Sequence, residues 1–118
     1  LKLIWLEGLA RPPAMPAQKE PFQKSEVDVV VVDDEDICRA AAASALKRYG
    51  FAYVHEVESG VEALQKIKEL QHSGGEAPVI VFLDLSEPVC QGLECGRQVQ
   101  RMSAQRKFVR EPFLVGLS

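Results

Sequence analysis

A chain of 118 residues suffices for one domain with a hydrophobic core, and 47% hydrophobic and 26% charged residues are typical of globular proteins. The net charge of −3 argues against nucleic acid or an anionic membrane as partner. No apolar run reaches the roughly 18 residues of a membrane span. Three cysteines without a CxxC pair argue against a disulfide framework and favour packing thiols in a reducing, cytoplasmic setting.

The first 25 residues are expected to lie outside the domain. Leu1 to Leu9 is apolar but interrupted by charges, so it is a poor signal peptide and reads as a helix end, an added strand or a vector-derived leader. Arg11 to Ser25 holds four prolines and reads as an extended linker. The chain starts without Met, as a fragment would. We therefore divide it into a segment with linker, residues 1–25, and a domain, residues 26–118.

From Val27 onward, apolar strands alternate with helices. Five of the six residues from Val27 to Val32 are valine, which indicates a strand buried on both faces. An Ala-rich helix then ends at Gly50, and Ser59 with Glu62 forms the capping box of a second helix. The sequence predicts strands at residues 27–32, 51–57, 79–83 and 112–118, and helices at residues 37–49, 59–70 and 93–102.

This alternation predicts an α/β fold, a doubly wound parallel sheet with helices on both faces. Ligands of such sheets bind at the carboxyl ends of the strands, where the chain carries Asp33, Asp34, Asp84 and Ser118. Gathered carboxylates repel one another, which favours a hard divalent cation, and Mg²⁺ fits oxygen ligands best. The purely structural alternatives to a metal site are that Asp33 and Asp34 cap the following helix, that Asp84 is a turn residue and that Ser118 is an ordinary serine.

Zinc is not expected, because no Cys-rich or His-rich ligand spacing is present. His55 and His72 are isolated in the sequence, and we expect both to be surface or core residues rather than ligands.

Four motifs in this order resemble the receiver domain of two-component response regulators: VVVVDDED (29–36), ESGVEAL (58–64), VFLDLSEPVCQGLE (81–94) and FLVGLS (113–118). The resemblance implies a flavodoxin-like topology. It also implies Mg²⁺ at Asp33 and Asp34, and a phosphoryl group accepted by Asp84. Ser86 would offer its backbone carbonyl to the metal, and the Ser118 hydroxyl would contact the phosphoryl group. The implied partner is a histidine kinase or histidine phosphotransfer protein.

The chain departs from the family pattern after Asp84, where Glu87, Cys90 and Gln91 replace the usual two methionines and an acid. The fifth βα unit and its lysine are also missing from this chain, and Lys47 and Lys107 lie in the wrong places to replace that lysine. A sheet without that strand exposes an apolar edge. We expect residues 1–6, LKLIWL, to cover this edge in cis or from a second copy, which leaves a homodimer open.

Three functions follow from these patterns. The first is a phosphoacceptor signalling domain, with self-phosphorylation and autodephosphorylation and with the linker joining it to an upstream module, as in hybrid kinases. The second is a pseudo-receiver that acts only as a protein-interaction module, as Glu87, Gln91 and the missing lysine suggest. The third, a metal-dependent hydrolase of similar topology, is disfavoured because Ser86 stands where such enzymes place a second aspartate.

Overall fold

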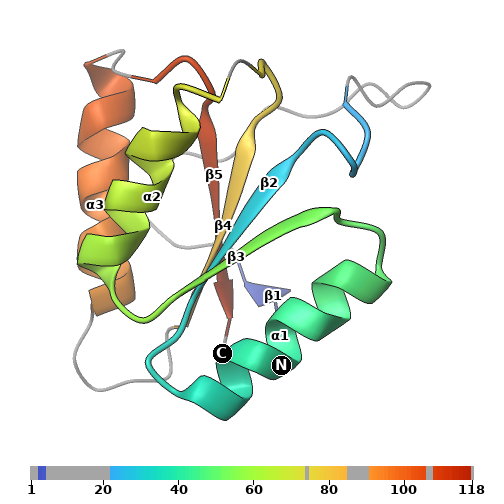
Figure 1. Cartoon of the computed structure of the whole chain (residues 1–118). Coiled ribbons are helices and arrows are strands. Elements are labelled where there is room, and N and C mark those ends of the chain that lie inside the picture. Colours follow the sequence, from blue (N-terminus) through green and yellow to red (C-terminus); the bar gives the residue numbers. More distant parts are fainter. Residues whose placement is uncertain (1–2, 5–21, 74, 85–90, 106–107, 118) are drawn as a thin grey trace.

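The computed structural model describes residues 3–4, 22–73, 75–84, 91–105 and 108–117, which form one sheet flanked by helices (Figure 1). Every predicted strand and helix is present, and its ends lie within two residues of the expected ones. In chain order the elements are β1 Leu3–Ile4, β2 Asp28–Val32, α1 Asp36–Arg48, β3 Tyr53–Val57, α2 Gly60–Leu70, β4 Val79–Asp84, α3 Gln91–Ala104 and β5 Pro112–Leu117.

The sheet has the strand order β1-β5-β4-β2-β3, and the four strands β2 to β5 are parallel. Helix α1 lies on one face of the sheet, and α2 and α3 lie side by side on the other (Figure 1). This is the doubly wound α/β arrangement that the alternation of strands and helices predicts. Within the described ranges, no helix has the length and apolarity to cross a bilayer.

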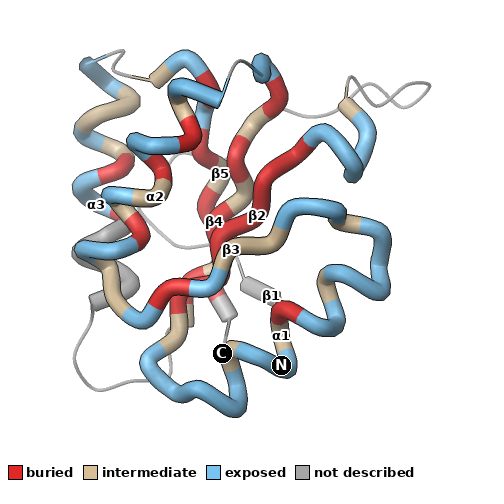
Figure 2. The backbone as a smooth tube through the Cα atoms, viewed as in Figure 1, coloured by how far each residue is buried: buried red, intermediate tan, exposed pale blue. Residues whose placement is uncertain are grey.

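The valines of β2 build the core on both faces of the sheet, because successive side chains of a strand point to opposite sides. All five residues of β2 are buried, as Figure 2 shows. Val30 and Val32 pack with Ile67 of α2 and Val99 of α3. Val29 and Val31 pack on the α1 side, so the prediction of a strand buried on both faces is confirmed.

The α1 face is covered unevenly. Helix α1 lies over β2 and β3, while the apolar side chains that β4 and β5 present on this face are only half-buried among the described residues. Strand alternation assigns them to this face because Leu83 and Leu114 belong to the opposite core cluster. They are Ile80, Phe82, Phe113 and Val115.

Strand β1 covers part of the edge of β5 in the same chain. Leu3 pairs with Leu117 and Ile4 with Gly116, antiparallel to β5. The expectation that the amino-terminal apolar segment covers this edge is confirmed in cis for these two residues. The other residues of LKLIWL lie outside the described ranges.

Both predicted helix signals are present, the capping box with one changed donor. The Glu62 backbone N–H donates to Ser59 Oγ at 3.2 Å, and Glu62 Oε2 accepts from the Glu58 N–H at 2.9 Å, one residue before the usual capping-box donor. At the end of α1, Gly50 has φ +116°, its N–H donates to Lys47 O, and the Phe51 N–H donates to Leu46 O. This is a Schellman motif, which needs a left-handed residue at Gly50.

Replacing Gly50 with alanine is expected to lower the free energy of unfolding by about 1–2 kcal/mol, because a Cβ strains this backbone conformation. The added Cβ would also lie 3.3 Å from Lys24 Cδ. Urea unfolding followed by circular dichroism measures the change. Gly75→Ala is the matched control, since its Cβ meets only ordinary contacts with Arg110. Equal stability of the two variants would contradict the prediction.

The amino-terminal ends of the strands hold a buried charged cluster. The Arg110 side chain is only 2% exposed, and its Nη1 lies 2.7 Å from Asp28 Oδ2. The His55 ring N–H donates to the other oxygen, Asp28 Oδ1, at 2.7 Å. Arg110 also donates to Ala77 O and Ser73 Oγ, each at 2.7 Å. These bonds connect β2 and β3 with the segments that precede β4 and β5.

Candidate functional site

The carboxyl ends of β2 and β4 bring three aspartates together. The two strands are adjacent and parallel, with Val32 opposite Leu83, so the residues that follow Val32 lie beside the end of β4. Asp33, Asp34 and Asp84 each offer one carboxylate oxygen, and these oxygens lie within 4.8 Å of one another. The structure therefore places the three predicted acids in one cluster, the acid cluster.

The electrostatics of the acid cluster are unfavourable without a cation. The pKa of Asp33 is raised above its ordinary value, first by partial burial and then by repulsion from Asp84, Asp34 and Glu35. The hydrogen bond from the Glu35 backbone N–H to Asp33 Oδ1, 2.9 Å long, opposes this rise. The part of this rise that comes from the neighbouring acids indicates negative charge that is not compensated.

The donor set of the acid cluster fits a hard divalent cation. All its ligand atoms are carboxylate oxygens, and three protein ligands leave coordination positions for water or a phosphoryl oxygen. No histidine or cysteine belongs to this group among the described residues, so the ligand chemistry of a zinc site is absent from it.

Helix capping does not explain the two aspartates. The N-cap residue of α1 is Glu35, whose side chain makes no capping bond. Asp33 instead closes a local turn by accepting the Glu35 N–H, and this bond occupies only one of its two oxygens. Neither aspartate is therefore the N-cap residue of α1.

Arg39 is a neighbour of the acid cluster that the sequence reasoning missed. It lies on α1, and its Nη1 donates to the backbone carbonyl of Asp33 at 2.8 Å. Its other contacts are acidic: Nη2 lies 2.6 Å from Asp36 Oδ1, and two longer contacts reach the end of β3. The sequence signal for this contact is a basic residue six positions after Asp33. This signal is weak, because the contact depends on the conformation of the turn between the two residues.

The structure corrects one expectation about the cysteines. Cys38 is exposed rather than packed in the core. Its Sγ donates to Glu35 Oε2 at 3.3 Å, and this bond is the main cause of a raised thiol pKa. Neither histidine belongs to the acid cluster: His72 is exposed, and His55 bonds to Asp28 at the opposite end of the sheet.

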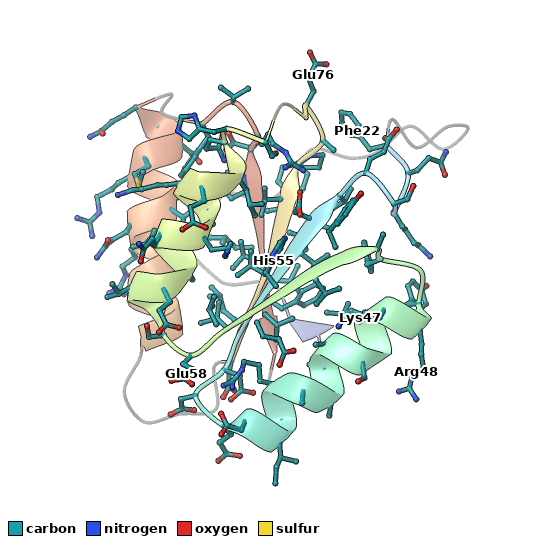
Figure 3. All side chains as sticks on the ribbon, in the orientation of Figure 1. Phe22, Lys47, Arg48, His55, Glu58 and Glu76 are labelled. Atoms are coloured by element: carbon teal, nitrogen blue, oxygen red, sulfur yellow. The ribbon has the colours of Figure 1, made fainter. Side chains whose placement is uncertain are left out.

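The other two predicted site residues, Ser86 and Ser118, lie outside the described residues. Glu87, Cys90 and Lys107, which the sequence analysis also discussed, lie outside them as well. Lys47 lies on the last turn of α1, at the end of the helix remote from its start beside the acid cluster (Figure 3).

Comparison with known proteins decides which family this geometry belongs to. The family described as "Response regulator receiver domain" matches residues 29–109, which is more than half of the chain. This chain belongs to the response regulator receiver family. The matched range of the receiver includes Asp33, Asp34 and Asp84, and the flavodoxin-like topology that the resemblance implied is the one observed.

The receiver is similar to domains of larger kinases and to a small chemotaxis protein. It is 37% identical over 81 residues to "Sensor kinase CckA" of Brucella abortus (strain 2308), a match of 69% of this chain and 8% of the kinase. It is 30% identical over 81 residues to "Chemotaxis protein CheY" of Bacillus subtilis (strain 168), covering 69% and 62% of the two chains. "Probable histidine kinase 6" of Oryza sativa subsp. japonica is 35% identical over 84 residues, 71% of this chain and 8% of the kinase. The receiver thus spans less than two thirds of each of these relatives.

Proposed function

We propose that this receiver accepts a phosphoryl group on Asp84 from a phosphohistidine of a histidine kinase or histidine phosphotransfer protein, with Mg²⁺ bound at the acid cluster. The observation that carries the proposal is the convergence of Asp33, Asp34 and Asp84 from two adjacent strand ends. Membership of the receiver family supports the same role. Similarity to histidine kinases supports a place in a two-component or phosphorelay system.

The chemistry requires a nucleophile and neutralisation of charge. A carboxylate oxygen of Asp84 attacks phosphorus, the phosphorus–nitrogen bond to the donor imidazole breaks, and the departing nitrogen keeps the electron pair. The product is an acyl phosphate. Phosphoryl transfer depends mainly on positioning and electrostatic stabilisation, and Mg²⁺ would supply positive charge that offsets the negative charge of the transferred group. In this proposal Asp33, Asp34, Asp84 and the Ser86 carbonyl hold the metal.

Two further assignments complete the proposal. The hydroxyl of Ser118, which follows β5, donates a hydrogen bond to the bound phosphoryl group. This contact transmits the phosphorylation state of Asp84 to the rest of the domain. Water then hydrolyses the acyl phosphate. In this proposal the receiver catalyses both its own phosphorylation and its own dephosphorylation. We place it in the cytoplasm, with a protein partner and without nucleic acid, and assign residues 26–118 to the receiver and residues 1–25 to its amino-terminal segment and linker.

Intact-mass measurement after incubation with acetyl phosphate and Mg²⁺ tests this proposal. We expect a gain of one phosphoryl group, absent in Asp84→Asn and absent when EDTA replaces Mg²⁺. Asp84→Asn keeps the size of the side chain but removes the nucleophilic charge. Glu76→Gln is the control, because Glu76 is exposed at the amino-terminal end of the sheet, far from the acid cluster (Figure 3).

The alternative is a pseudo-receiver that only binds other proteins. Glu87 favours it, because this acid follows Asp84 closely in the sequence and adds negative charge near an incoming phosphoryl group. The same experiment separates the two functions. No mass gain from acetyl phosphate, together with no effect of Mg²⁺ on the melting temperature, would support the pseudo-receiver for this chain.

A further inference from the structure

Arg39 has an unusual environment for a surface arginine. Its side chain is only 12% exposed, and it contacts three separate parts of the chain. Nη1 donates to the Asp33 carbonyl at 2.8 Å, between β2 and α1. Nη2 bonds to Asp36 on the first turn of α1 at 2.6 Å. Nε lies 3.6 Å from Glu56 Oε1 on β3, and Nη2 lies 3.9 Å from Glu58 Oε1 just beyond that strand.

The bond to Asp33 bears directly on the acid cluster. The carbonyl of Asp33 belongs to the peptide group that joins Asp33 to Asp34, so its direction sets where the Asp34 side chain begins. The N–H of Asp33 donates to Val57 O on β3 at 3.2 Å. The backbone of Asp33 is therefore held on one side by β3 and on the other by Arg39.

We propose that Arg39 is a positioning residue: it fixes the peptide between Asp33 and Asp34 so that their carboxylates stand ready for a divalent cation. The inference rests on the proposed function, because it assigns a role toward the same metal. Arg39 is no ligand itself. It acts on the metal through the backbone of a ligand, as groups behind a first coordination shell do.

If only the charge of Arg39 mattered, its removal would change the Mg²⁺ affinity in the opposite direction. The direction of the change therefore tests the inference. A positive side chain beside a cation site repels the metal, so its removal should tighten Mg²⁺ binding if only charge matters. The positive charge of Arg39 is largely compensated by Asp36, Glu58 and Glu56, the acids that raise the pKa of its guanidinium group, with the Asp36 hydrogen bond as the largest cause. Loss of positioning should instead weaken binding.

Lysine separates charge from geometry. A guanidinium group presents five donors in a rigid planar fork and can bond to the Asp33 carbonyl and to Asp36 at the same time. An ammonium group carries the same charge as a compact point on a flexible stem. Arg39→Lys therefore keeps the charge of the wild type but loses much of the fixed geometry.

The experiment measures Mg²⁺ affinity by isothermal titration calorimetry for the wild type, Arg39→Ala, Arg39→Lys and Arg48→Ala. We expect the Kd to rise roughly tenfold or more in Arg39→Ala, as typical for groups that orient metal ligands, and by less in Arg39→Lys. Arg48→Ala removes the same charge at the far end of the same helix and should leave the Kd unchanged (Figure 3). At saturating Mg²⁺, Arg39→Ala should regain mass labelling by acetyl phosphate.

Circular dichroism in EDTA shows whether each variant folds, so a loss of structure is recognised apart from a loss of affinity. An Arg39→Ala receiver that folds and binds Mg²⁺ as tightly as the wild type, or more tightly, overturns the positioning role. Failure of labelling to recover at saturating Mg²⁺ also overturns it. If Arg39→Ala does not fold, Arg39→Lys decides: weaker binding supports the role, and wild-type affinity ends it. A wild type that binds no Mg²⁺ removes the proposed function as well.

Discussion

Arg110→Met is expected to lower the free energy of unfolding by about 3–5 kcal/mol, the usual cost of removing one partner of a buried ion pair. Arg110 is 1% exposed, and Asp28 is 8% exposed. Methionine fills much of the space of the arginine stem but cannot neutralise or bond to the carboxylate. Among the described residues, Asp28 would keep its contact with His55 but lose its ion pair, and the carbonyl of Ala77 would lose its Arg110 donor.

Urea unfolding in EDTA measures this effect without a contribution from bound metal. Arg97→Met is the control, because Arg97 is an exposed arginine on α3 and its loss should change stability by no more than about 0.5 kcal/mol. The double variant Asp28→Leu, Arg110→Met should recover part of the lost stability, since it removes both buried charges. Equal stability of Arg110→Met and Arg97→Met would show that the buried pair contributes nothing.

Asp33→Asn is expected to change stability in opposite directions with and without Mg²⁺. In EDTA the melting temperature should rise, because the substitution removes a charge that Asp34 and Asp84 repel. The wild type gains about 2.7 kcal/mol at a Mg²⁺ concentration a hundredfold above Kd, or roughly 10 °C for a domain of this size. Asp33→Asn should lose most of that gain, because a ligand charge is missing.

The pH dependence in EDTA should follow the raised pKa of Asp33. The folded state takes up a proton more readily than the unfolded state, so stability falls as pH rises from the ordinary value of 3.8 through the raised one. Above the raised pKa, the charged Asp33 carboxylate destabilises the folded state to its full extent. Asp33→Asn should lack this component, whereas Glu76→Gln should keep it. An identical response of Asp33→Asn and the wild type to both pH and Mg²⁺ would rule out a role of Asp33 in the acid cluster.

The fold could be predicted from the sequence because its strongest signals are local. The valines of β2, the glycine stop at Gly50 and the Ser59 cap each determine structure within a few residues. The acid cluster could also be predicted, although its members are distant in sequence, because the carboxyl ends of neighbouring parallel strands meet at one edge.

What could not be predicted depends on side-chain conformations and contacts that no spacing specifies. Arg110 meets Asp28 across 82 positions of sequence, and its bonds to Ala77 and Ser73 depend on how the loop before β4 is built. Arg39 reaches the Asp33 carbonyl only because the turn between them folds back. The exposure of Cys38 follows from the rotation of α1 on the sheet, which its weakly amphipathic, alanine-rich sequence does not determine.

The register of β1 aligns Leu3 with the end of β4. Leu117 stands opposite both Leu3 and Asp84, so these three residues form one row across β1, β5 and β4. Two strand spacings, about 10 Å, separate the backbone of Leu3 from that of Asp84. Because β1 runs antiparallel to β5, Leu3 lies nearer the carboxyl edge of the sheet than Ile4 does. A label at Leu3 therefore lies beside the end of the sheet that carries the acid cluster, whereas one placed near Glu76 lies at the opposite end of the sheet (Figure 3).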